Sequence, residues 1–297
     1  MNAGINASGR ICGKPKVVIG VPVFNEATYL KQSLDSLIGL SYKNLEIVVS
    51  DNGSTDGTSA LIHEFASKDH RIKYIRHDCN IGAQANFQYC LDNSDGDYFM
   101  WGSGHDLWGS ELVKNCVEYL ESDPDCVLAY GSTVCIDGNG SPSREREFPS
   151  YDTIGLHKAL ARMHFVLWGS MNPILGVFRA SALSDTKLVN VVGSDLIFLL
   201  EMSLKGTFKL IATDTFYRRE VRQLETHDER MKRYTGSNFS IYKGPVSRAL
   251  PMISLAWTIL RMIAASKLPL LEKSLALVSF FFIFPAKLLV GKNNRKP

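Results

Sequence analysis

Two apolar segments near the N-terminus, separated by a stretch long enough for a helix, constrain the fold of this chain most. Lys16–Pro22 and Leu45–Ser50 are rich in β-branched residues, which favour strands, and both end abruptly in polar, turn-forming residues. Between them, Ala27–Ile38 has the length of a helix. A strand, a helix and a second strand in this order form a βαβ unit with parallel strands. The sequence therefore predicts an α/β protein.

The same alternation continues up to about residue 137. Further strands are predicted at Ile72–Arg76, Tyr98–Trp101 and Val127–Tyr130, and further helices at Thr58–Lys68, Gln84–Asn93 and Ser110–Asp123. This alternation predicts a mostly parallel sheet that is covered by helices on both faces. Beyond it we predict a helix at Leu156–Trp168, a short strand at Leu175–Arg179 and a helix at Asp195–Lys205.

Polar and aromatic side chains follow the first two predicted strands. In open α/β sheets, ligands bind at the carboxyl ends of the strands. The residues at those ends here are Pro22, Phe24, Asn25, Glu26, Asp51 and Asn52. An aromatic ring, two carboxylates and two amides suit a nucleotide that carries sugar hydroxyls. An ordinary dinucleotide-binding unit is disfavoured, because no Gly-x-Gly-x-x-Gly opens the first helix.

Charge and cysteine content narrow the possible partners. The net charge of the whole chain is only +3, which gives no general case for nucleic-acid binding. None of the six cysteines forms a Cys-x-x-Cys pair, so we expect reduced thiols in a cytosolic protein and no zinc site. Residues 1–15 are polar and lack the apolar core of a signal peptide, so we expect a flexible N-terminal tail.

The C-terminal segment, residues 246–297, differs from the rest of the chain. It carries eight Lys or Arg and one acid, so its charge is +7 while the remainder is −4. Within Arg248–Lys267, one helical face is predicted to carry Leu250, Ile253, Trp257, Leu260 and Ile263. The longest uncharged run, Ser274–Ala286, has 13 residues, whereas a spanning helix needs about 20. We predict basic amphipathic helices that bind a membrane surface; packing against the preceding domain is the alternative.

The strand-end motifs carry a family resemblance. Pro22 to Glu26 (PVFNE) and Asp51 to Thr58 (DNGSTDGT) resemble the motifs of family 2 glycosyltransferases. The resemblance continues through Asn80-Ile81-Gly82, Gly96-Asp97-Tyr98-Phe99 and His105-Asp106, and more loosely to Asp195. It implies a GT-A fold, which is Rossmann-like with a mostly parallel sheet and helices on both faces, over residues 16–240.

The resemblance also implies an activity: inverting transfer of a sugar, of the hexosyl type, from a nucleoside diphosphate donor to a saccharide or lipid-linked acceptor. Such an enzyme would act in cell-surface polysaccharide synthesis, as a cytoplasmic protein held at the inner face of the cell membrane. The residues implied for nucleotide binding are Pro22, Phe24, Glu26, Asp51, Asn80, Gly82 and His105.

Individual roles follow from the same resemblance. Phe24 stacks on the base, Asp51 accepts a hydrogen bond from the base imide N–H, and Glu26 contacts the ribose or the base. Asn80 lies in the loop near the base and the diphosphate, where Gly82 allows close backbone approach. An acceptor for an imide N–H favours uracil or thymine, and UDP is the expected nucleotide, although guanine also offers a donor edge.

The metal-binding motif of the family is altered in this chain. Where family members have Asp-x-Asp followed by another acid, Ser103 replaces the first acid and His105 the second, and only Asp106 is retained. A Mn²⁺ or Mg²⁺ ion held by Asp106, His105 and the diphosphate is still expected, because Mn²⁺ accepts imidazole more readily than Mg²⁺ does. The alternative is that His105 only caps a turn.

The predicted catalytic base is Asp195, which follows a glycine in the family's Gly-x-Asp context. Its alternative role is that of a helix N-cap. A basic run downstream could close over the diphosphate, because Arg binds phosphate oxygens in pairs, or could be a solvated face. This run comprises Arg218, Arg219, Arg222, His227 and Arg230, with His227 as the second candidate base.

Two other functions compete with this interpretation. One is transfer of sugar directly to polyprenyl phosphate, which the same fold can support. The other is non-catalytic binding of a nucleotide sugar, and the altered Asp-x-Asp is its only support. The retained acids Asp51, Asp106 and Asp195 favour an enzyme, because binding alone requires no base.

Overall fold

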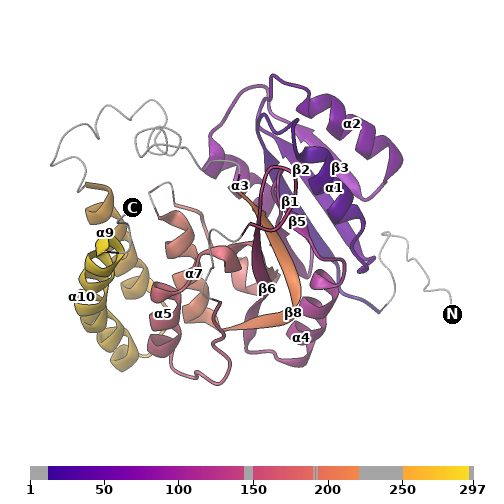
Figure 1. Ribbon diagram of the computed structural model, residues 1–297. Coiled ribbons are helices and arrows are strands. Elements are labelled where there is room, and N and C mark those ends of the chain that lie inside the picture. The colour runs from indigo at the N-terminus through magenta and orange to yellow at the C-terminus, as the bar shows by residue number, and fades with distance from the viewer. Residues whose placement is uncertain (1–12, 144–149, 190, 192, 221–249, 294–297) are drawn as a thin grey trace.

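The computed structural model of the chain describes residues 13–143, 150–189, 191, 193–220 and 250–293 (Figure 1). An eight-stranded sheet in the order β3-β2-β1-β4-β7-β6-β8-β5 forms its centre. Its strands are β1 (Val17–Val23), β2 (Leu45–Asp51), β3 (Ile72–Arg76), β4 (Tyr98–Trp101), β5 (Leu107–Trp108), β6 (Cys126–Ile136), β7 (Val177–Arg179) and β8 (Thr207–Arg219). β7 and β5 are antiparallel to their neighbours, and the other pairs are parallel.

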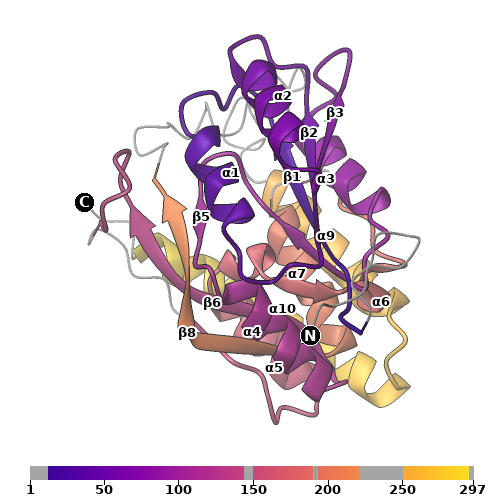
Figure 2. The ribbon, with the colours of Figure 1, turned by 90° about the vertical axis from the view of Figure 1, so that its right-hand side faces the viewer.

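Helices cover both faces of the sheet (Figures 1 and 2). One hydrophobic core lies under α1 (Leu30–Ile38), α2 (Thr58–Lys68) and α4 (Leu112–Ser122). The second core lies under α3 (Ala83–Asp92), α5 (Ala159–Trp168), α7 (Ser194–Lys205), α9 (Leu250–Ala265) and α10 (Leu270–Asn293). Two short helices, η1 (Asn172–Leu175) and α6 (Ala180–Leu183), flank β7. The predicted α/β architecture is confirmed.

The two covered faces explain why the first strand reads as a continuous apolar run. Val17, Ile19 and Val21 pack into the core under α1, whereas Val18 packs into the core on the other face. A strand that is buried on both faces needs apolar residues at every position. In the second core, the Trp101 ring lies edge-on to three neighbouring phenylalanine rings, those of Phe99, Phe178 and Phe198.

The element boundaries differ from the sequence prediction in ways that have local causes. The first helix begins at Leu30 rather than Ala27, because the N–H of Ala27 donates to Asp56 Oδ2 (3.1 Å) and holds this turn against the next loop. The strand predicted at Val127–Tyr130 extends to Ile136, because beyond a register shift at Gly131 it continues to pair with β8. Strand β8 itself was not predicted: its burial does not alternate, since the register shifts within it.

The C-terminal helices have apolar residues on more than one face. Ile253 and Trp257, on the face that the sequence predicted to be apolar, are each 62% exposed. The buried stripe of α9 is instead Leu255, Ile259 and Ile263, which pack into the core under α7. Helix α10 contributes Phe280 and Phe284 to the same core and continues to Asn293. Within the described residues, no helix is long and apolar enough to cross a membrane.

Candidate active site

The carboxyl ends of the parallel strands β1, β2, β3 and β4 meet at one edge of the sheet, as the fold class predicts. Val23, the last residue of β1, lies opposite Asp51, the last residue of β2. The N–H of Asn52 donates to the carbonyl of Val23 (2.9 Å) and joins the two strand ends. The PVFNE and DNGSTDGT motifs are therefore neighbours, and Pro22 lies in register with Ser50.

Asn25 fixes the PVFNE turn to the second motif. Its φ is 54°, a left-handed conformation that asparagine adopts more readily than most residues. The N–H of Asn25 donates to Ser54 Oγ (2.9 Å), and its Oδ1 accepts from the N–H of Thr55 (2.9 Å). The turn leaves the preceding Phe24 42% exposed, so its ring is available for stacking.

Asp51 lies at the expected strand end, but its side chain is completely buried. Oδ1 accepts from the N–H of Ser54 (2.9 Å), and Oδ2 accepts from Ser59 Oγ (2.6 Å), Tyr74 Oη (3.1 Å) and Arg76 Nη1 (2.8 Å). A direct hydrogen bond to a base is not available to the carboxylate in this conformation. Asp51 instead holds the DNGSTDGT loop against β3.

We expect Asp51→Asn to lower the free energy of unfolding by about 1.5–3 kcal/mol at pH 7, because a hydrogen bond to a charged group usually contributes that much to stability. Burial alone would raise the pKa of Asp51, but the hydrogen bonds from Ser54, Ser59 and Tyr74 lower it below its ordinary value. The stabilisation is therefore complete above the unfolded pKa of about 3.9 and is lost as the pH falls further. Urea unfolding at pH 7 and pH 3 checks this: the difference between the two proteins should shrink at pH 3, and an equal difference would contradict it.

A second loop, after β3, is tied to the same edge by amide side chains. Asn52 Nδ2 donates to Asn80 Oδ1 (3.0 Å), and Asn52 Oδ1 accepts from the N–H of Ile81 (2.8 Å). Gly82 precedes α3 with a φ of 93°, and a Cβ there would meet nothing within 4 Å. Glycine is therefore needed for its conformation, not for space. Asn52 was among the strand-end residues that the sequence indicated, but Arg76 was missed, although it ends β3 as Asp51 ends β2.

Glu26, His105 and Asp106 come together although they lie in different segments. His105 Nδ1 lies 3.1 Å from Glu26 Oε1, and its Nε2 lies 4.0 Å from Asp106 Oδ2. If Nδ1 carries the hydrogen and donates it to Glu26, Nε2 offers its lone pair on the Asp106 side. Histidines that bind a metal usually donate their other ring N–H to a carboxylate in this way, which fixes the orientation of the ring.

Asp106 is held rigidly. Asp106 is only 3% exposed. Its Oδ2 accepts a hydrogen bond from Ser103 Oγ (2.7 Å), and its Oδ1 accepts one from the backbone N–H of Arg219 (2.8 Å). Each oxygen keeps a second lone pair, so the carboxylate can still bind a cation. Within the described ranges, no group of three or more His, Cys, Asp or Glu residues could hold a metal alone. Asp106 and His105 therefore fit a metal only as an open site that the diphosphate completes.

The two arginines at the end of β8 have opposite surroundings. Arg219 is 3% exposed, and its guanidinium donates to protein oxygens, so neither role considered for the basic run, closing over a diphosphate or a solvated face, fits this residue. Arg218 is exposed, and its Nη1 donates to Asn172 Oδ1 (2.6 Å) at the start of η1. Arg222, His227 and Arg230 lie outside the described residues.

Asp195 is exposed in the first turn of α7. The N-cap position of this helix belongs to Gly193, which has a φ of 85°, so the alternative role considered for Asp195 is excluded. Ser194 is buried, and its hydroxyl accepts a hydrogen bond from Gln84 in the first turn of α3. The N-termini of α3 and α7 are therefore joined, which brings Asp195 to the side of the site where Gly82 lies.

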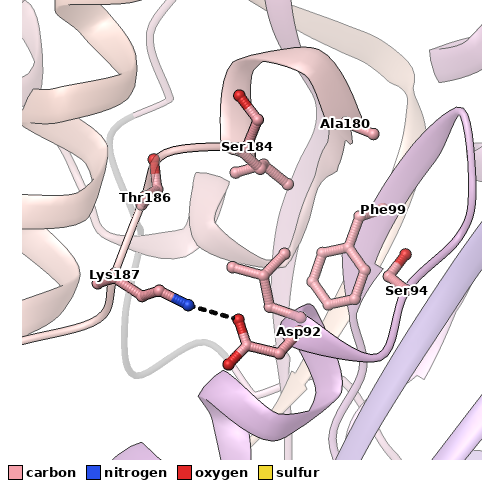
Figure 3. Close-up of a pocket in the computed structure, with 9 residues that line it drawn as sticks. Asp92, Ser94, Phe99, Ala180, Ser184, Thr186 and Lys187 are labelled. Atoms are coloured by element: carbon pink, nitrogen blue, oxygen red, sulfur yellow. Dashed lines mark hydrogen bonds and ion pairs between the residues drawn. The ribbon is translucent and has the colours of Figure 1, made fainter.

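A small cavity of about 230 Å³ lies elsewhere on the molecule (Figure 3). It opens between the C-terminal end of α3 and α6, beside the ion pair of Lys187 Nζ and Asp92 Oδ1 (2.8 Å). Because α3 runs from the carboxyl edge of the sheet toward the amino edge, the cavity lies at the edge opposite the candidate site. Its ion pair is largely exposed, at 72% for Lys187 and 47% for Asp92. The cavity therefore does not belong to the site described above.

The fold and the polar groups at the carboxyl edge of its sheet define an α/β protein of the GT-A class. The model of the family described as glycosyl transferase family 2 matches residues 18–185, more than half of the chain. The chain belongs to this family.

Relatives and solved structures agree with this class. The chain is 40% identical over 108 residues to the glycosyltransferase GlyA of Streptococcus pneumoniae, a match that covers 35% of this chain and 15% of GlyA. It is 34% identical over 118 residues to an uncharacterized glycosyltransferase of Haemophilus influenzae, a match that covers 40% of this chain and 36% of the relative. These matches span well under half of each relative.

The similar solved structures share the fold at low identity. S. aureus TarS 1-349 in complex with UDP-GlcNAc has a TM-score of 0.63 and 17% identity, over 90% of this chain and 71% of that chain. The mannosyltransferase PcManGT of Pyrobaculum calidifontis, in complex with GDP-Man and Mn²⁺, has a TM-score of 0.55 and 17% identity, over 92% and 81% of the two chains. The predicted GT-A fold is therefore confirmed.

Proposed function

We propose that this glycosyltransferase moves a sugar from a UDP-sugar donor, with inversion, to a saccharide or lipid-linked acceptor in cell-surface glycan synthesis. The observation that carries the proposal is the cluster of Glu26, His105 and Asp106 at the carboxyl edge of the sheet, beside the exposed Phe24. These groups offer an aromatic face for a base and a rigid acidic and imidazole pair for a diphosphate with its metal.

The proposal for the donor base is uridine. Phe24 stacks on the base, and the amide network of Asn52 and Asn80 borders it. Asp51 shapes this site by holding the DNGSTDGT loop, because the carboxylate itself is enclosed. The TarS structures in complex with UDP and with UDP-GlcNAc support uridine, whereas the GDP-Man complex of PcManGT makes guanosine the competing base.

The proposed reaction is a single displacement at the anomeric carbon. Asp195 takes the proton of the acceptor hydroxyl while the acceptor oxygen attacks the anomeric carbon on the side opposite to UDP. The bond between the anomeric carbon and the diphosphate breaks, and UDP leaves with the bonding electrons. The guanidinium of Arg218 is exposed and donates to Asn172; in the proposed reaction it also donates to the departing diphosphate. A bound Mn²⁺ or Mg²⁺ would supply charge stabilisation of the diphosphate. Asp106 and His105 would hold it.

We also propose that the enzyme works at the inner face of a membrane. The outer faces of α9 and α10 expose large apolar side chains that the core does not use: Ile253, Trp257, Leu270, Leu271, Leu275, Val278, Phe281 and Phe282. Arg261 and Lys267 are exposed beside them, and the segment as a whole has the basic excess described above. An apolar stripe beside cations suits an anionic lipid surface.

Binding of nucleoside diphosphates tests the donor proposal. Calorimetry with UDP, GDP, ADP and CDP, with and without Mn²⁺, should give the tightest binding for UDP, and Phe24→Ala should weaken it about tenfold, since stacking on an aromatic ring is worth about 1–3 kcal/mol per base. A preference for GDP, or equal affinity of Phe24→Ala and the unchanged protein for UDP, would contradict the proposal.

Vesicle flotation tests the membrane proposal. The full-length protein should float with vesicles of phosphatidylcholine and phosphatidylglycerol at low salt. The double variant Phe281→Ser with Phe282→Ser should bind at least tenfold less, because each buried Phe contributes about 1.5–3 kcal/mol. Lys267→Glu should also weaken binding, whereas Lys114→Glu on α4, on the other face of the sheet, should not. Equal flotation of all variants would refute the proposed membrane binding.

A further inference from the structure

We propose that Arg219 is a positioning residue for the glycosyl transfer: it holds the loop that carries His105 and Asp106 in the place where the donor diphosphate binds. The inference rests on the function proposed above for those two residues. Arg219 is the last residue of β8 and comes more than a hundred positions after the loop that it holds.

Arg219 contacts the loop through both its backbone and its side chain. Its N–H donates to Asp106 Oδ1 (2.8 Å), and its Nε donates to the carbonyl of His105 (2.9 Å). The carboxylate of one residue and the backbone of the other are therefore fixed by a single buried residue. Any shift of Arg219 would move both candidate diphosphate-binding groups relative to Glu26.

The remainder of the guanidinium is anchored to two other segments. Nη1 donates to the carbonyls of Asp137 (2.9 Å) and Gly138 (2.8 Å) in the turn after β6, and Nη2 donates to Gln32 Oε1 (2.6 Å) on α1. The guanidinium lies over the ring of Tyr29, 4.6 Å from its centroid. These anchors are neutral oxygens and an aromatic ring, so they fix the direction of the side chain.

Arginine suits this role where lysine does not. A guanidinium presents five N–H donors in a rigid plane, whereas an ammonium presents three donors around one atom. Arg219 uses Nε for the loop and both terminal nitrogens for the anchors, which lie in different directions. Lysine at this position would keep the charge but lose the link between the loop and its anchors.

Arg162 offers a matched control, because it is a buried arginine with the same kind of partners. It is 8% exposed on α5; its Nε donates to the carbonyl of Ser203 (2.7 Å) and its Nη1 to those of Leu156 (2.8 Å) and His157 (2.9 Å). None of these groups belongs to the candidate site. Arg162→Lys and Arg219→Lys should therefore both lower stability, but only the second should change the site.

The experiment compares UDP binding by calorimetry in the presence of Mn²⁺, at a temperature where each variant is folded. We expect Arg219→Lys to weaken UDP binding about 10- to 100-fold, as loss of a supporting residue typically does, and Arg162→Lys to leave it unchanged. Gln32→Ala removes one anchor without touching the loop, and should weaken binding about two- to tenfold. Gln32→Ala takes the place of Arg219→Lys in this comparison if Arg219→Lys does not fold.

Hydrogen exchange of the ligand-free protein gives a second readout. Amides of residues 103–108 should exchange faster in Arg219→Lys or Gln32→Ala than in the unchanged protein, and at the unchanged rate in Arg162→Lys. Unchanged exchange in this segment, or UDP binding weakened equally by Arg162→Lys, would overturn the inference. If the unchanged protein binds no UDP but the exchange differs as expected, Arg219 positions the loop and the proposed donor is wrong.

Discussion

Asp195→Asn should lower turnover by roughly 10²–10⁴-fold, the usual contribution of a general base, while the affinity for UDP stays nearly the same. Asparagine keeps the size of the side chain but cannot take the proton of the acceptor hydroxyl. The position tolerates the change, because Asp195 is exposed and Gly193, not Asp195, occupies the N-cap of α7.

Steady-state rates with a UDP-sugar, together with UDP calorimetry, check this prediction for Asp195. An unchanged melting temperature would show that the variant is folded. If turnover survives in Asp195→Asn, the base lies elsewhere, and His227, outside the described residues, is the next candidate. If UDP affinity falls in parallel with turnover, Asp195 acts in donor binding and not as the base.

Asp106→Asn should abolish the enhancement of UDP binding by Mn²⁺, and it should lower turnover about 10- to 100-fold. The substitution keeps both local hydrogen bonds, because the amide oxygen can accept from the N–H of Arg219 and the Ser103 hydroxyl can accept from the amide nitrogen. The negative charge is then the main loss.

The control for Asp106 is His105→Ala, which should weaken Mn²⁺-dependent UDP binding less, because the carboxylate carries the charge. Calorimetry with Mn²⁺ and with EDTA separates the two contributions. Equal UDP affinity in Mn²⁺ and in EDTA for the unchanged protein would show that the site works without metal. The exposed Arg218 would then be the next candidate for the cation that binds the diphosphate.

The fold and one part of the site could be predicted from the sequence because their signals are local. Strand β1 and the residues that end it are adjacent in the chain, so Phe24 and Glu26 could be placed at the carboxyl edge from the strand pattern alone. The same holds for Asp51 at the end of β2. A parallel sheet brings such ends together whatever the connecting helices contain.

The surroundings of these residues could not be predicted, because they depend on distant contacts. That Asp51 is enclosed by Ser59, Tyr74 and Arg76 follows from the packing of β3 against β2, and the strand pattern does not encode it. The contact of Arg219 with Asp106 joins residues that are 113 positions apart. Two interpretations of the basic run were open, and neither indicated that Arg219 is buried, because its partners lie far away along the chain.

The C-terminal helices show the same limit of a helical pattern. The sequence correctly indicates amphipathic character, but α9 has apolar residues on two faces, and periodicity alone does not tell which of them is buried. The core selects Leu255, Ile259 and Ile263 and leaves Trp257 outside. One face of α9 therefore packs against the preceding domain, and the membrane binding that we propose concerns the other face.

Release of nucleotide from a panel of sugar donors tests the central claim most directly. The full-length protein is incubated with UDP-, GDP- and ADP-sugars, Mn²⁺, anionic vesicles and a lipid extract as the source of acceptor, and the freed nucleoside diphosphate is measured. The account predicts release of UDP from a UDP-sugar, strongly reduced in Asp195→Asn and in Asp106→Asn. Release of GDP alone, or equal release of UDP by the unchanged protein and both variants, would contradict it.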